Sequence, residues 1–123
     1  MILIGDKLVP FEEISNILNI EDIKTTKANS TIAFGYNEKI MKYSFENDLN
    51  SAIIVNSIKE SIYANALNAK YIIANKNLAK DIQKTAENYM FDSKVLAIIE
   101  SNEEIEEIAS YEIDGVIFKT LLG

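Results

Sequence analysis

The most informative stretch of the chain is residues 52–74, which read AIIVNSIKESIYANALNAKYIIA. Two continuous apolar runs, Ala52–Val55 and Tyr71–Ala74, bound it. Between them Ser57, with a glutamate three residues later, has the spacing of a capping box, which starts a helix. The segment Ile58–Asn68 then places apolar residues three and four positions apart, as on one buried helical face. A strand, a short turn, a helix and a second strand in this order predict a βαβ unit with parallel strands.

The same alternation continues along most of the chain. Apolar runs that lack polar alternation are typical of strands covered on both faces. Five such runs are Thr31–Gly35, Ala52–Val55, Tyr71–Ala74, Val95–Ile99 and Gly115–Phe118. Amphipathic segments between them predict four helices, over Asn37–Asn47, Ile58–Asn68, Leu78–Met90 and Asn102–Ser110, the last with a capping box at Ser101. The residues expected in the core are Ile54, Ile62, Ile73, Ile82, Leu96, Ile98, Ile105 and Val116.

These elements predict an α/β fold with about five mostly parallel strands and four crossover helices. We expect an open three-layer sheet, and the alternative is half of a TIM barrel. The first thirty residues suggest a hairpin of Met1–Ile4 and Lys7–Phe11, a short helix over Glu12–Leu18 and a polar connection over Asp22–Ser30. No linker divides the chain, so residues 1–123 are expected to form one domain.

Composition narrows the class of protein. The chain is 48% hydrophobic and contains no cysteine, which predicts a globular protein without disulfides and favours a cytoplasmic location. The N-terminus has no basic region before its short apolar run, so no targeting peptide is expected. The apolar run Val95–Ile99 is far shorter than the roughly 20 residues of a membrane span. We therefore expect no membrane partner.

Charge and missing residue types exclude several functions. The net charge is −7 and every basic residue is lysine, so the acidic chain lacks the arginine-containing basic stripe that is typical of nucleic-acid binders. It also lacks histidine, which together with the absence of cysteine excludes Ser–His and Cys–His nucleophile arrangements. The sequence therefore assigns no catalytic residue, metal ligand or cofactor, and it favours a function other than catalysis.

Polar residues follow the predicted strands at their carboxyl ends, where parallel α/β sheets bind ligands. If the last three strands are neighbours, Glu100 lies between Lys76 and Lys119, and these three side chains either bind a ligand or balance one another at the surface. The sequence predicts a site for a small polar or anionic molecule at this edge. Its candidate residues are Asn56, Ser57, Asn75, Lys76, Glu100, Ser101, Lys119 and Thr120.

Two resemblances accompany these patterns. The stretches Ser57–Ala66 and Ala86–Tyr89 resemble a small family of bacterial α/β proteins of unassigned function. Residues Glu104–Gly123 are similar to the last βα unit of phosphate-binding TIM barrels, although Lys119 stands where those barrels usually have a phosphate-binding glycine. Because a full barrel needs about 250 residues, this resemblance implies at most half a barrel.

Three functions remain open from the sequence. The first is a non-catalytic module that binds a small polar or anionic molecule at the carboxyl edge of the sheet. The second is an interaction or assembly protein that acts as a homo-oligomer, with a homodimer as one possibility, or packs on a larger partner. The third is an enzyme that uses lysine or carboxylate chemistry.

Overall fold

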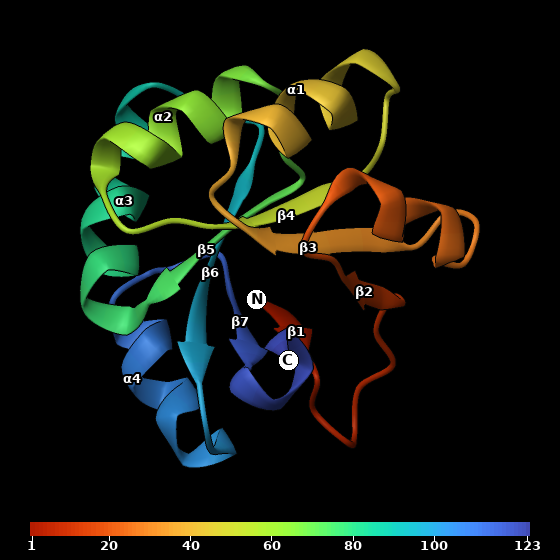
Figure 1. Cartoon of the computed structure of the whole chain (residues 1–123). Coiled ribbons are helices and arrows are strands. Elements are labelled where there is room, and N and C mark those ends of the chain that lie inside the picture. The colour runs from red at the N-terminus through yellow and green to blue at the C-terminus, as the bar shows by residue number, and fades with distance from the viewer.

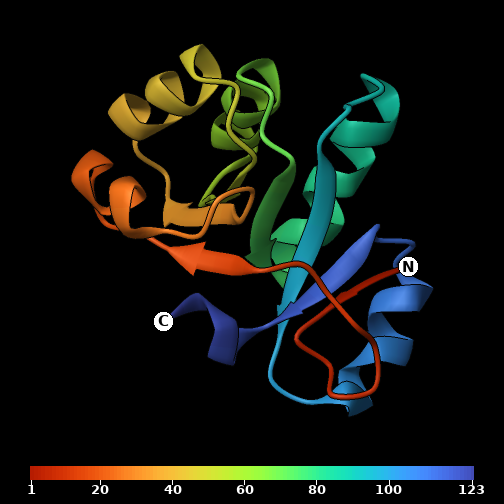
Figure 2. The same cartoon turned by 90° about the vertical axis from the view of Figure 1, so that its right-hand side faces the viewer.

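The computed structural model of the chain describes residues 1–123 and contains one sheet of seven parallel strands (Figure 1). The strand order is β1-β7-β6-β5-β4-β3-β2, so from β2 onward each strand pairs with the next one in the sequence. The sheet curls into a half-barrel whose free edges are β1 and β2 (Figure 2). The strands are β1 (Ile2–Ile4), β2 (Ile14–Asn16), β3 (Thr31–Gly35), β4 (Ser51–Ile54), β5 (Tyr71–Asn75), β6 (Lys94–Ile99) and β7 (Gly115–Phe118).

Short helices connect most of the strands. The α-helices are α1 (Glu38–Glu46), α2 (Ile58–Ala66), α3 (Lys76–Asn88) and α4 (Ile105–Ser110), and the 3-10 helices are η1 (Ile20–Thr25), η2 (Asn102–Glu104) and η3 (Lys119–Leu122). Polar side chains cap the helices: the Asn37 side chain accepts a hydrogen bond from the Ile40 amide, and Asn75 accepts one from the Leu78 amide, although neither cap was predicted from the sequence. None of the helices has both the length and the hydropathy that a membrane crossing needs.

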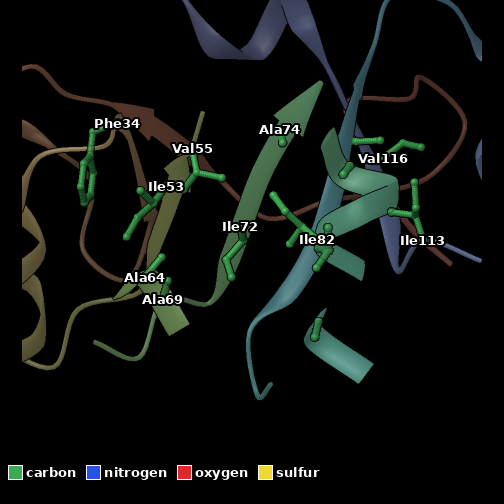
Figure 3. Close-up of a cluster of buried hydrophobic side chains, with 14 of the residues drawn as sticks. Phe34, Ile53, Val55, Ala64, Ala69, Ile72, Ala74, Ile82, Ile113 and Val116 are labelled. Atoms are coloured by element: carbon green, nitrogen blue, oxygen red, sulfur yellow. The ribbon is translucent and has the colours of Figure 1, made fainter. Parts of the chain in front are cut away.

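The α-helices all cover one face of the sheet, and side chains alternate between its two faces. Ile53, Ile72 and Val116 point toward the helices and form a core with Ile82 of α3 (Figure 3). Their strand neighbours Ala52, Ile73 and Ile117 belong to a second cluster on the inner, concave face. Successive neighbouring strands joined by right-handed crossovers place every helix on the same side. The expected three-layer sheet is therefore wrong, and the half-barrel alternative describes the architecture.

The five predicted strands are present with small shifts of their ends, but the sheet has two more strands, at its edges. The N-terminal hairpin and the short helix over residues 12–18 were wrong predictions. β1 pairs in parallel with β7, and β2 is a strand that pairs in parallel with β3. The spacing of Ile14, Ile17 and Leu18 fits a helix as well as a strand. The edge of β3 decides between them, because Thr31 donates its amide to Glu13 and Ile17 donates its amide to Ala33.

Most of the predicted core residues lie inside. Ile73, Ile82, Leu96 and Val116 are fully buried, and Ile54, Ile98 and Ile105 are partly buried. Ile62 is the exception, with 46% of its surface exposed. Helix α2 turns the small residues Ser61 and Ala64 toward the sheet and thereby directs Ile62 outward.

A partly buried polar cluster lies at the amino ends of three strands. Glu12, which precedes β2, accepts hydrogen bonds from the Thr31 hydroxyl at 2.6 Å, the Lys70 ammonium at 2.7 Å and the Tyr71 hydroxyl. Burial opposes the charge of Glu12, but these three donors outweigh it and lower the pKa of the carboxyl group. Burial and the Glu12 carboxylate raise the pKa of Tyr71, so the phenol remains a donor. The cluster ties together the starts of β2, β3 and β5.

Glu12 is expected to make the protein less stable in acid. Since its folded pKa is lowered, its contribution is fully present above its unfolded pKa of about 4.3 and is lost as the pH falls through the lower folded value. Urea unfolding measured between about pH 6 and 3 should show this loss, and Glu12→Gln should remove that part of the pH dependence. An unchanged pH profile in the variant would assign the acid sensitivity to other carboxylates.

Candidate functional site

The largest cavity lies at the free β2 edge and reaches the carboxyl ends of β3 and β4. Its volume is about 780 Å³, and it is open to solvent. Asn16 of β2, Gly35 of β3 and Ile54 of β4 line it together with the C-terminal residues Leu122 and Gly123. The cavity therefore has the position at which parallel α/β proteins bind ligands.

Two features define the border of this cavity. A Cβ atom added at Gly35 would meet no other atom within 4 Å, so the strand end borders free space. The Asn16 side-chain amide donates a hydrogen bond of 2.7 Å to the carbonyl of Leu121, which joins the β2 edge to the C-terminal 3-10 helix. The Asn16–Leu121 hydrogen bond therefore joins two parts of the cavity wall, and Gly35 leaves another part free of side-chain atoms.

The lining combines apolar and polar groups. Ala33, Phe34, Ile54 and Leu122 provide apolar surface, and the polar groups come largely from β2 and from η1 with the turn after it. The polar lining residues are Glu13, Ser15, Asn16, Asp22, Thr25, Thr26 and Lys27. An apolar surface with a few placed polar groups is characteristic of small-molecule sites.

Negative charge exceeds positive charge around the cavity. Lys27 is its one cationic lining residue and lies 4.0 Å from the exposed Glu13 carboxylate. The Asp22 carboxylate accepts hydrogen bonds from the backbone amides of Leu18 and Asn19, at 2.9 and 3.2 Å. With two carboxylates and one ammonium, the lining does not favour an anion.

A smaller cavity of about 360 Å³ adjoins the first and shares Ile17, Leu18, Phe34 and Gly35 with it. It extends toward the starts of α1 and α2, where Tyr36, Asn37, Asn56 and Glu60 line it. The Glu60 carboxylate accepts the Asn56 amide at 2.8 Å, and the Asn37 side chain caps α1. Burial, and then the neighbouring Glu38 carboxylate, raise the pKa of Tyr36, so this phenol stays neutral.

Three of the eight residues predicted for the site serve as helix caps. The Ser57 hydroxyl accepts the Glu60 amide at 3.1 Å, and the Asn75 side chain accepts the Leu78 amide at 3.0 Å. Ser101 caps η2 in a capping box with Glu104. Their side-chain oxygens are thus engaged with backbone donors. Of the eight, Asn56 is the one that lines either of the two cavities described above.

The predicted charged trio is divided into two separate groups. The Lys119 ammonium lies 3.4 Å from Glu100, and both side chains are exposed. Lys76 instead contacts Glu107 at 2.9 Å and Glu104 at 3.2 Å, and these hydrogen bonds raise its pKa. Thr120 is exposed in η3. Both lysines therefore have carboxylate partners within the chain, which leaves no concentrated positive charge at this rim.

The cavity residues contributed by β2 and by the C-terminus are not predicted by the sequence. The spacing around Asn16 predicts a helix, and Leu122 and Gly123 come close to it only through the curl of the sheet. A usable signal was Gly35, which ends the first predicted strand at the position of a βα turn. No cluster of three or more histidine, cysteine, aspartate or glutamate side chains is placed to hold a metal ion.

The chain matches no protein-family model and no curated protein sequence. A function is therefore inferred from the geometry of the cavities described above.

Proposed function

We propose that the protein is a non-catalytic module that binds a small polar molecule in the cavity at the β2 edge. The observation that carries this proposal is the open space of about 780 Å³ at the carboxyl ends of parallel strands, with mixed apolar and polar walls. This cavity lies at one end of the sheet edge for which the sequence predicts a ligand site. One of the predicted site residues, Asn56, lines the adjoining smaller cavity.

The lining charges refine the class of ligand. Glu13 and Asp22 outnumber Lys27, and the whole chain has a net charge of −7. A neutral or positively charged polar molecule is therefore favoured over an anion. Asn16 and Ser15 can orient such a molecule through hydrogen bonds, while Ile54 and Leu122 cover its apolar part.

Gly35→Leu provides the test, because a Cβ atom at this lining residue meets no neighbour within 4 Å and the leucine side chain would occupy part of the cavity. Thermal unfolding is measured with free amino acids, amino sugars and polyamines, and with organic acids and sugar phosphates as anionic comparators. A compound present at 100 times its dissociation constant should stabilise the protein by about 2.7 kcal/mol, which is a shift of several degrees. We expect at least one neutral or cationic compound to raise the Tm of the parent and not that of Gly35→Leu.

Gly35→Ala is the matched control, since its methyl group occupies little of the cavity. It should retain most of the shift. The proposal fails if no neutral or cationic compound stabilises the parent, or if the shift is equally large in Gly35→Leu.

A further inference from the structure

Helices α1 and α2 lie side by side on the outside of the sheet (Figure 1). Both helices expose apolar side chains. Phe45 of α1 is 46% exposed, and Ile62 and Tyr63 of α2 are 46% and 49% exposed. Between the helices lies a groove of about 430 Å³, to which Met41 and Leu67 also contribute. We call these five residues the α1–α2 face. Exposed apolar side chains gathered beside a groove are typical of an interaction site.

The α1–α2 face combines a ridge with a groove. Ile62 and Tyr63 project from α2, while Phe45, Tyr63 and Leu67 line the depression between α2 and α1. Helices pack by inserting the ridge of one into the groove of another. A ridge beside a groove meets one geometric requirement of a two-fold interface, in which the same patch packs against itself.

Charge indicates how a second copy would be oriented. The two helices both follow parallel strands and therefore run in roughly the same direction, so Glu46 at the end of α1 and Lys59 at the start of α2 lie at opposite ends of the face. Neither residue forms an ion pair within the chain. If α2 of a partner copy enters the groove antiparallel to α1, the partner's Lys59 comes to lie beside Glu46. The two-fold axis generates the same pair a second time.

We propose that the α1–α2 face is a homodimer interface, in which α2 of each copy occupies the α1–α2 groove of the other and Glu46 pairs with the partner's Lys59. Two nine-residue helices form a face of roughly 14 by 20 Å. Two such faces amount to roughly 560 Å² in total, below the about 1,000 Å² of a stable specific interface. A weak, transient dimer with a dissociation constant on the order of 100 µM is therefore expected.

Charge exchange tests the arrangement. Glu46→Lys and Lys59→Glu each place like charges together twice per dimer, and each should weaken association by about tenfold. The double variant Glu46→Lys, Lys59→Glu restores opposite charges and should recover most of the affinity. Both changes suit the helix dipole, because they put a cation at a helix end and an anion at a helix start, so folding should be preserved.

Sedimentation equilibrium between about 1 and 500 µM gives the dissociation constants, and circular dichroism confirms folding. Ile62→Asp should abolish association, whereas Met90→Asp, at an 85% exposed residue outside the face, should leave it unchanged. The proposal is overturned if the parent stays monomeric throughout this range, or if Ile62→Asp still dimerises. A double variant no tighter than the single variants would overturn the antiparallel arrangement.

Discussion

Replacing Gly115 by alanine is expected to lower the free energy of unfolding by about 3 kcal/mol, a large effect for the addition of one methyl group. Gly115 is buried at the start of β7, where β1 approaches on one side and β6 on the other. A Cβ atom there would lie 2.5 Å from the Ile2 carbonyl oxygen and 2.9 Å from a methyl carbon of Leu96. The Ile2 contact is with backbone, so the new methyl can be accommodated only if β1 moves away from β7.

Chemical denaturation followed by circular dichroism measures this loss, and hydrogen exchange locates it. The amides of β1 should lose protection more than those of β4, because β1 is the strand that must shift. Gly35→Ala is the matched control, since it adds the same methyl group to a strand glycine that has no atom within 4 Å of the new carbon. Equal midpoints for the two variants would show that β1 does not need this close approach.

Ile73→Ala is expected to destabilise the protein by about 2–5 kcal/mol. Ile73 has no exposed surface and lies on the inner face of β5, in the middle of the sheet. Its removal leaves a cavity enclosed by strands on both sides, which cannot collapse without distorting backbone hydrogen bonds. Urea unfolding of the variant and the parent at the same low protein concentration gives the difference.

Ile62→Ala is the comparison, because the same atoms are removed from a residue that is nearly half exposed. At a concentration where the protein is monomeric, its cost should be below about 0.5 kcal/mol. Similar losses for the two variants would contradict the burial of the inner face of the sheet. At high concentration Ile62→Ala should in addition weaken the proposed dimer.

The free β2 edge of the sheet is central to the proposed binding site. A closed barrel fills its interior with side chains and has no edges. In this chain β1 and β2 do not pair, and the hydrogen bond from Asn16 to Leu121 is one direct link between the β2 edge and the C-terminus. The cavity lies beside the β2 edge, so the proposed binding site depends on the incomplete curl of the sheet.

The side-chain contacts at the predicted ligand edge could be predicted only in part, as three charged residues show. The sequence placed Lys76, Glu100 and Lys119 at one edge but could not choose their partners. Helix η2 brings Glu104 to Lys76, 28 positions earlier in the chain, and its capping position fixes the Glu104 carboxylate. Partners at such separations depend on how neighbouring crossovers pack, and local patterns do not specify that packing.

By itself the sequence determined the βαβ units between residues 31 and 118, because their signals are local. The continuous apolar runs gave the central strands, and the caps Ser57 and Ser101 gave two helix starts. Only the tertiary structure decided the edges and the curl. The strands β1 and β2 have three residues each, too few for a hydrophobic period to distinguish a strand from a helix. They become strands because the edges of β7 and β3 offer backbone hydrogen-bond partners, and those contacts are distant in the sequence.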